Sequence, residues 1–344
     1  MPPRRPFQRL KNLLIYVVIR GAVALAAALL PLGAARALGR ALGALGWRVA
    51  RRERARARAA ATAVLGAAPG EAAARASFVG LGEAAGEAVK LDALARDFDR
   101  AGTTGPVRLD AADARVLEDA LAEGRGVVYV TAHLGNWELM AAYLAWRGFP
   151  IWTVARASYD PRLTALIDGW RRRHGVHAIL RGAGAGGATD AGVVRRCLKA
   201  LRARRVLGLL LDQDLGDAPH VVAPFLGRAA RVATGPAELA LRSSAPVVAG
   251  FATRAAPGVH RLRIERLAVC PGPGRHGDAA ALARRMSAAI EAAILGSPSD
   301  WVWLHDRWRG VPGPGKAGGT APPRLGVNPQ SKPRARSSPL ALHP

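Results

Sequence analysis

The chain has 344 residues, half of them hydrophobic, which allows one large or two ordinary domains with a substantial core. Its two cysteines, Cys197 and Cys270, are too few and too far apart for a disulfide framework or a cysteine-based zinc site. The formal net charge of +25 suits an anionic partner, but the aromatic residues, 5% of the chain, do not interleave with arginines as a base-stacking surface requires, so no nucleic-acid partner is expected.

Residues 12–34 form the one segment that is long and apolar enough to approach a membrane span, although Arg20 interrupts it. One charge in the middle of a helix costs roughly 3 kcal/mol on insertion scales, which this run can absorb, so a spanning helix and an interfacial helix are both open. Basic residues are denser downstream, which places the main body in the cytoplasm. A cleaved signal is disfavoured because the arginine-rich run 51–58 would translocate poorly. We therefore expect a membrane-anchoring helix within residues 1–35.

The middle of the chain changes from helical to alternating periodicity. Residues 36–98 are expected to be helical with a break near Pro69 and Gly70, and a helix follows over 110–123. Short apolar runs then alternate with amphipathic stretches. The expected strands are 126–131, 151–155, 176–180 and 206–211, and the expected helices between them are 135–147, 160–174 and 189–203. This alternation predicts an α/β fold with a mostly parallel central sheet flanked by helices.

The last third of the chain is expected to be more irregular. Residues 212–233 are rich in loop signals, and the elements after them are a helix near 236–243, strands at 246–252 and 259–269, and a helix at 277–295. An aromatic segment at 301–308 closes the ordered part. From residue 311 the composition of Pro, Gly, Ser and basic residues predicts a disordered tail. The expected division is therefore an anchor (1–35), a catalytic domain (36–310) and a basic tail (311–344).

A candidate catalytic pair follows the first strand of this alternating region. His133 comes directly after the strand at 126–131, and Glu138 lies five residues later, at the start of a helix. A histidine beside a carboxylate can act as a general base, and ligands of open α/β sheets bind beyond the carboxyl ends of the strands. Backbone amides near Gly135 and Asn136 are candidates to stabilise a developing oxyanion.

Two other patterns give competing hypotheses. Residues 182–187 fit G-x-G-x-x-G, but Arg181 breaks the strand-to-turn junction and the next strand-end acid, Asp212, lies about thirty residues on rather than about twenty. A flexible connector is therefore favoured over a dinucleotide site. Asp212 and Asp214 also fit a metal-binding pair of a glycosyltransferase, or a pair that holds an arginine. No metal and no cofactor are expected.

The stretch from His133 to Glu138 resembles the His-x-x-x-x-Asp/Glu motif of the bacterial lipid A biosynthesis acyltransferases. Further resemblances follow in the family's order and extend the similarity over roughly residues 10 to 310. They lie at 154–156 with 160–163, at 211–214, at 224–227, at 233–240 with 245–248, and at 301–308. The Gly-Ala run at 182–187 is looser than the family pattern, and the tail at 311–344 lies outside it.

This resemblance implies a glycerolphosphate-acyltransferase-like fold and an O-acyl transfer reaction. His133 would take the proton of an acceptor hydroxyl as it attacks the thioester of an acyl-carrier protein, and Glu138 would orient the imidazole. Asn136, Arg156 and Asp212 are assigned to substrate binding. Arg156 would lie near the head group or the oxyanion, with a surface salt bridge as the alternative, and Asp212 would hold an arginine.

The resemblance also implies the partners and the location. The acyl donor would be an acyl-carrier protein, and the acceptor a lipid A precursor in late lipopolysaccharide biosynthesis, or another glycolipid such as a phosphatidylinositol mannoside. The enzyme would lie on an anionic membrane surface at the cytoplasmic face of the bacterial inner membrane. A membrane-tethered nucleic-acid-binding protein and a nucleotide-dependent glycosyltransferase are the alternatives from other classes.

Two further residue groups have open roles. Cys197 is expected to be a buried small hydrophobe rather than a nucleophile. The tryptophans Trp301, Trp303 and Trp308 fit either an anchor at the lipid interface or a hydrophobic clasp near the end of the domain.

Overall fold

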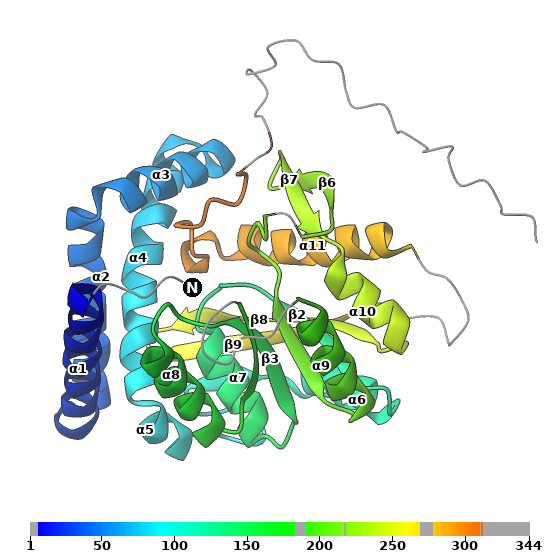
Figure 1. Ribbon diagram of the computed structural model, residues 1–344, viewed down its shortest axis with the longest axis horizontal. Helices are drawn as coiled ribbons and strands as arrows, with labels where there is room; N and C mark the ends of the chain where they lie inside the picture. Colours follow the sequence, from blue (N-terminus) through cyan, green and yellow to red (C-terminus); the bar gives the residue numbers. More distant parts are fainter. Residues whose placement is uncertain (1–5, 183–189, 217, 269–277, 310, 312–344) are drawn as a thin grey trace, which may run out of the picture. The chain divides into compact units, whose positions relative to one another are not determined.

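The computed structural model describes residues 6–182, 190–216, 218–268, 278–309 and 311 (Figure 1). Its N-terminal part is helical, as predicted for residues 36–98. The helices are α1 (Pro6–Leu29), α2 (Leu32–Val49), α3 (Arg51–Leu65), α4 (Ala67–Val89) and α5 (Leu91–Arg96).

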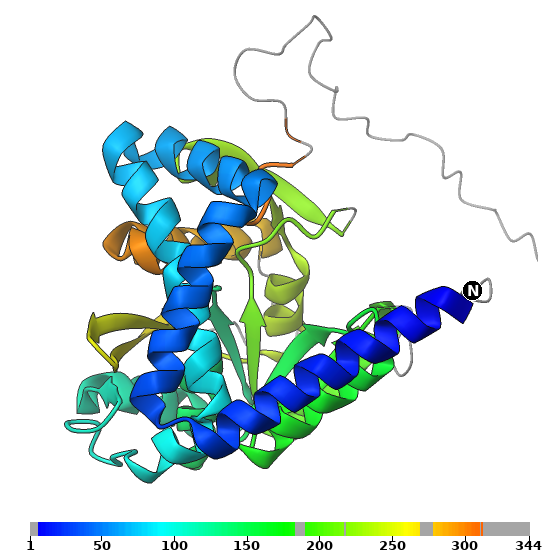
Figure 2. The same ribbon diagram turned by 90° about the vertical axis from the view of Figure 1, so that its left-hand side faces the viewer.

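Two helix boundaries differ from the sequence prediction, and proline explains both. The apolar stretch 12–34 is divided between α1 and α2, which meet at an angle (Figure 2), because Pro31 cannot donate the backbone hydrogen bond that a continuous helix needs. The break predicted near Pro69 lies instead at Gly66, which has a positive φ. Pro69 is in the first turn of α4, where a missing N–H group is tolerated.

Helices α2 and α4 pack through glycines at very short distance. A Cβ atom on Gly39 would lie 2.2 Å from the carbonyl oxygen of Gly82, and one on Gly43 would lie 2.3 Å from that of Phe78. Any side chain at these positions would push the helices apart. This contact fixes the rotation of α2, so that its small residues face α4 and its leucines face away.

Among the described residues, seven strands form the central sheet in the order β1-β9-β8-β2-β5-β3-β4. All neighbouring strands run parallel except β8 and β9, which form an antiparallel pair. The prediction of a mostly parallel sheet flanked by helices is confirmed. The strands are β1 (Val107–Leu109), β2 (Val127–Thr131), β3 (Ile151–Arg156), β4 (His177–Arg181), β5 (Val206–Leu210), β8 (Val247–Ala256) and β9 (Val259–Ala268).

The helices that connect the strands cover both faces of the sheet. They are α6 (Ala111–Ala122), α7 (Trp137–Trp146), α8 (Pro161–Arg173), α9 (Asp190–Arg202), α10 (Gly235–Ser243) and α11 (Ala279–Gly296), and a short 3-10 helix, η1 (Pro298–Asp300), follows. Alternate residues of β2 enter two separate cores. Val128 and Val130 pack with residues of α9, α10 and α11, whereas Val127 and Tyr129 pack with residues of α5, α6 and α7. Such two-sided burial explains the uninterrupted apolar sequence of β2.

The stretch 212–233 contains a β-hairpin where only loop was predicted. Strands β6 (His220–Phe225) and β7 (Arg228–Ala233) pair antiparallel and form a separate two-stranded sheet. Pro224 within β6 is a signal against a strand, and it is accommodated here because a two-stranded sheet consists only of edges. The short strand β1 was also not predicted, because three residues give no measurable periodicity.

The C-terminal tryptophans form a hydrophobic clasp rather than a lipid anchor. Trp301, Trp303 and Trp308 are all buried and belong to the core that also contains α10 and α11. Phe225 of the hairpin lies 6.0 Å from the ring of Trp301 and 6.3 Å from that of Trp308. The segment 301–308 therefore closes the core on one face of the sheet. The tail from 312 onward and residues 183–187 of the glycine run lie outside the described residues.

Candidate active site

His133 lies two residues beyond the end of β2, at the carboxyl edge of the sheet, and is held there by Asp212. The imidazole Nδ1 is 2.9 Å from Asp212 Oδ1, and the backbone N–H of His133 donates to Asp212 Oδ2 at 3.1 Å. Asp212 follows β5, which is the strand next to β2 in the sheet. One carboxylate therefore fixes both the backbone and the ring of His133, and the Nδ1–H tautomer leaves Nε2 as the basic atom.

Asp212 is buried and ionised. Its side chain has no exposed surface, and Oδ2 also accepts a hydrogen bond from the indole N–H of Trp301 at 2.9 Å. Burial alone would raise the pKa of Asp212, but the charge and hydrogen bond of His133, with the bond from Trp301, lower this pKa to about 2. The sequence-based role of Asp212, a substrate-binding group that holds an arginine, does not fit this geometry because the carboxylate is closed to solvent and occupied by His133 and Trp301.

Glu138 lies in the first turn of α7 and makes a two-point ion pair with Arg171 of α8. Arg171 Nε donates to Glu138 Oε2 at 3.1 Å, and Arg171 Nη2 donates to Oε1. Burial lowers the pKa of Arg171, but the hydrogen bond and charge of Glu138 outweigh it and raise this pKa. The carboxylate that orients His133 is therefore Asp212, not Glu138 as the spacing predicted. Glu138 instead joins α7 to α8 beside the histidine.

Asn136 and Gly135 shape the turn between His133 and α7. Asn136 is 2% exposed; its Oδ1 accepts from the Leu139 amide, capping α7, and its Nδ2 donates to Glu87. With both ends of the amide occupied, the predicted substrate contact of Asn136 does not fit its burial. Gly135 has φ +60°, and its amide donates to the Asp300 carbonyl, so it is not free for an oxyanion. A Cβ on Gly135 would lie 1.8 Å from the Ala252 oxygen, which requires glycine here.

Arg156 ends β3 at the same carboxyl edge of the sheet. It is exposed, and within the described ranges it forms no ion pair, so the salt-bridge alternative is not what this structure contains. In the β3–β4 register Arg156 lies opposite Arg181, the last residue of β4. Two guanidinium groups at the ends of neighbouring strands suit an anionic or strongly polar ligand. The substrate contact of Arg156 stays a prediction.

Three residues that the structure brings to His133 were not predicted as site residues from the sequence. The ring of His305, from the closing segment, lies 5.0 Å from the His133 ring, and Trp137 lies edge-on at 4.9 Å. The Gln213 amide nitrogen is 2.9 Å from His305 Nε2 and 3.4 Å from His133 Nε2, the ring nitrogen that accepts in the Nδ1–H tautomer. Burial, aided by the nearby His133 and Arg56 charges and opposed by Asp212, lowers the pKa of His305 to about 4, so this histidine is neutral near pH 7. Its place in a tryptophan-rich run, 172 residues from His133, gave no signal of a site.

A family model for bacterial lipid A biosynthesis acyltransferases matches residues 4–310, a range that contains every residue of this cluster. The chain belongs to the bacterial lipid A biosynthesis acyltransferase family. The resemblance inferred from the His133–Glu138 motif is thereby confirmed, and the protein is an acyltransferase of this family.

Individual relatives agree with the family at the level of acyl transfer and differ in their acceptors. The acyltransferase is 26% identical over 230 residues to the phosphatidylinositol mannoside acyltransferase of Mycolicibacterium smegmatis, covering 64% of this chain and 67% of that protein. It is 27% identical over 192 residues to the protein of the same name from Mycobacterium tuberculosis H37Rv (56% of this chain, 57% of that protein). It is 28% identical over 200 residues to the lipid A biosynthesis lauroyltransferase of Escherichia coli K12 (57% and 60%). The matched regions thus cover between 57% and 67% of the lengths of these relatives.

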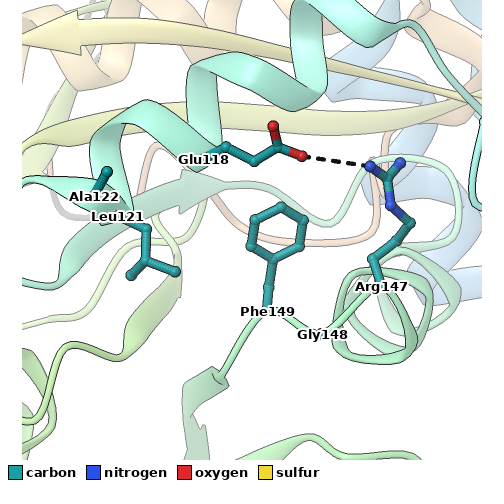
Figure 3. Close-up of a pocket in the computed structure, with 6 residues that line it drawn as sticks. All are labelled: Glu118, Leu121, Ala122, Arg147, Gly148 and Phe149. Atoms are coloured by element: carbon teal, nitrogen blue, oxygen red, sulfur yellow. Dashed lines mark ion pairs between the residues drawn. The ribbon is translucent and has the colours of Figure 1, made fainter.

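Two hollows of the acyltransferase are lined by residues other than His133. A pocket of about 380 Å³ is lined by residues of α6 and by Arg147, Gly148 and Phe149, and the Glu118–Arg147 ion pair at its rim measures 3.5 Å (Figure 3). Because Phe149 precedes β3, this pocket is at the amino edge of the sheet, opposite the chemistry. A second pocket of about 680 Å³ lies between α4 and residues 297–300. Neither pocket is lined by His133.

Metal chemistry and thiol chemistry find no support at this site. Within the part of the chain that the structure describes, no cluster of three or more His, Cys, Asp or Glu side chains is placed to hold a metal ion. The described side chain of Cys197 is buried, and burial raises the pKa of its thiol to about 11, as expected for a packing residue.

Proposed function

We propose that this acyltransferase moves a fatty acyl group from the thioester of an acyl-carrier protein to a hydroxyl group of a lipid A precursor. The observation that carries the proposal is the His133–Asp212 pair at the carboxyl edge of the sheet, because Asp212 holds Nδ1 of the imidazole and leaves Nε2 for a substrate. The partly exposed ring of His133 is accessible from outside, whereas Asp212 is not. This arrangement suits deprotonation of a hydroxyl group and needs no protein nucleophile.

In the proposed reaction His133 carries one proton from the acceptor hydroxyl to the thiol that leaves. Nε2 removes the proton from the acceptor hydroxyl as its oxygen attacks the thioester carbonyl carbon. The tetrahedral intermediate then breaks its C–S bond, and the imidazolium returns the proton to the departing thiolate. The products are an ester and a free thiol. Asp212, ionised because its pKa is about 2, balances the transient positive charge of His133 throughout.

The residues around His133 supply positioning. Arg156, exposed at the end of β3, is proposed to bind the polar head of the acceptor or the oxyanion. Glu138 is proposed to be necessary through its ion pair with Arg171, which fixes α7 against α8. Neutral His305 is placed to exchange hydrogen bonds with an acceptor hydroxyl near Nε2 of His133, since its ring lies 5.0 Å away.

A phosphatidylinositol mannoside is the second candidate acceptor. It is favoured by the names of two of the relatives, which match this chain at 26% and 27% identity, close to the 28% of the lauroyltransferase. Both acceptors present sugar hydroxyls beside phosphate and acyl chains. The proposed chemistry at His133 is the same for either one.

We place the enzyme on the inner membrane with its catalytic domain on the cytoplasmic face. Within the described residues, one helix is long and apolar enough to cross a bilayer: Lys11–Leu29 of α1, with mean hydropathy 2.0. The apolar surface continues onto α2, whose glycine contact with α4 turns a row of leucines outward. The exposed residues of this row are Leu38, Leu42, Leu45 and Val49. The exposed arginines Arg48, Arg51 and Arg52 follow directly, and these suit anionic lipid head groups.

A lipid-contact measurement tests this placement. In a background with Cys197→Ala and Cys270→Ala, an environment-sensitive fluorophore on Leu42→Cys is expected to shift to the blue and to be quenched by quencher-labelled acyl chains in anionic vesicles. The matched control is Val222→Cys on the hairpin, which is equally exposed at 57% but is expected to stay in water. Equal quenching at both positions, or at neither, would contradict an α2 contact with the bilayer.

The proposed reaction is tested with purified protein in detergent, an acyl-carrier thioester and a panel of acceptors containing lipid A precursors and phosphatidylinositol mannosides. The expected product is a glycolipid heavier by one acyl group, identified by mass spectrometry, with release of an equal amount of thiol. Transfer only to the mannosides would select the second acceptor. Salt-sensitive nucleic-acid binding, or metal-dependent sugar transfer, without any acyl transfer would support the rejected classes instead.

A further inference from the structure

A buried carboxylate outside the His133 motif connects four elements of the domain. Glu87, near the end of α4, is 1% exposed and accepts hydrogen bonds from three side chains. Arg36 Nε of α2 lies 2.9 Å from Oε1, His260 Nε2 of β9 lies 2.9 Å from Oε2, and Asn136 Nδ2 lies 2.7 Å from Oε2. We name these four residues the Glu87 cluster.

The Glu87 carboxylate accepts too many hydrogen bonds and is too deeply buried to belong to a surface ion pair. Burial by itself would raise the pKa of Glu87, but hydrogen bonds and charges from His260, Asn136 and Arg36 lower it to about 2, so the carboxylate is ionised. A buried charge of this kind is costly unless each partner keeps its geometry. The cluster therefore has a strong preference for one arrangement of its four side chains.

One member of the cluster belongs to the active-site turn. Asn136 lies between His133 and Glu138, and its amide is shared, because Nδ2 donates to Glu87 while Oδ1 caps the first turn of α7 through the Leu139 amide at 3.0 Å. The hydrogen bond to Glu87 fixes which way the amide faces. Through it, a carboxylate 46 residues before His133 is linked to the first turn of α7.

We propose that Glu87 is a positioning residue for acyl transfer, which acts through Asn136 to hold the turn between His133 and Glu138 and to tie that turn to α2 and β9. Glu87 does not touch substrate. This inference rests on the proposed function for its catalytic consequence, but the restraint on α7 is a property of the fold itself. It adds a residue that lies outside the His133–Glu138 motif to the machinery of the site.

The test exchanges the hydrogen-bond donor and acceptor between positions 87 and 136. Asn136→Asp sets two carboxylates against each other, and Glu87→Gln removes the charge. The double variant, Glu87→Gln with Asn136→Asp, restores one donor and one acceptor in reversed order and keeps a good N-cap at residue 136. Glu83→Gln is the matched control, because Glu83 lies one turn earlier on α4 and pairs with Arg40 of α2 and Arg254 of β8, but does not contact Asn136.

We expect Glu87→Gln and Asn136→Asp to lower kcat by about 10- to 100-fold, whereas the KM for the acyl-carrier thioester and the KM for the acceptor should stay close to parental. The rates are measured well below the melting temperature of each variant. The double variant should recover about tenfold over Asn136→Asp, and Glu83→Gln should stay within about twofold of the parent. Hydrogen exchange in the peptide 133–146 should be faster in both single variants and slower again in the double variant.

Lower melting temperatures with parental kcat would overturn the proposal, since the contact would then be structural only. So would a double variant no better than Asn136→Asp. If the parent itself transfers no acyl group, the proposed function fails. The restraint of α7 by Glu87 is then tested only by hydrogen exchange in the peptide 133–146. Unchanged exchange in Glu87→Gln would then refute it.

Discussion

His133→Ala is expected to lower kcat for acyl transfer by about 10²- to 10⁴-fold, the contribution of a positioned general base. The reason is that no other described side chain within this site is arranged to take the hydroxyl proton. The neutral His305 ring is held by Gln213 and lacks a carboxylate partner like Asp212. Steady-state rates with a saturating acyl-carrier thioester and acceptor measure the effect, and KM for the acceptor should change little because the lost interaction belongs to the transition state.

His177→Ala is the matched control for this experiment. His177 is an exposed histidine that stacks on Trp152 at the beginning of β4, at the opposite edge of the sheet from the site. Its loss should leave kcat within about twofold of the parent, as for most surface substitutions. A His133→Ala variant that is folded and transfers acyl groups at the parental rate would remove His133 from the mechanism.

Asp212→Asn is expected to lower kcat by about 10²- to 10⁴-fold, nearly as much as loss of the histidine. An asparagine at this buried position can donate its amide N–H to Nδ1 of His133, which would put the ring proton on Nε2 and remove the base. The backbone N–H of His133 and the indole of Trp301 would also lose a charged acceptor. The variant is isosteric, so the packing of the clasp should persist.

Glu138→Gln distinguishes the role of the Glu138 carboxylate from that of Asp212. Its main loss is the ion pair with Arg171, so we expect a smaller fall in kcat than for Asp212→Asn and a visible loss of thermal stability. The comparison uses kcat and melting temperature of both variants under the same conditions. The opposite order, with a near-parental rate for Asp212→Asn and an inactive Glu138→Gln, would return the orienting role to Glu138.

The central sheet and the position of His133 could be predicted because both depend on local pattern. A few consecutive residues are enough to predict the apolar strand β2 and the helix that follows it. Because the strands of a parallel sheet end at the same edge, a residue just after β2, such as His133, is expected at the carboxyl edge. The helix predicted over 160–174 is another case. α8 begins at Pro161, and the Asp160 side chain accepts from the Arg162 amide at its N-terminus.

The partners of the site residues could not be predicted, because they are set by tertiary contacts. Asp212 lies 79 residues from His133, and Arg171 lies 33 residues from Glu138. Proximity in sequence favoured Glu138 as the partner of His133, but the first turn of α7 directs that carboxylate toward α8 instead. The roles of His305 and Glu87 depend in the same way on segments that meet only in the folded chain.

The protonation of the His133 ring tests the proposed general-base mechanism most directly, because that mechanism requires a neutral imidazole with its proton on Nδ1, facing Asp212. Nitrogen-15 NMR of histidine-labelled protein, with His133 assigned by its absence in His133→Ala, reports which ring nitrogen carries the proton. We expect the Nδ1–H tautomer in the parent and a change to Nε2–H in Asp212→Asn. An Nε2–H tautomer in the parent, unaltered by Asp212→Asn, would contradict this mechanism.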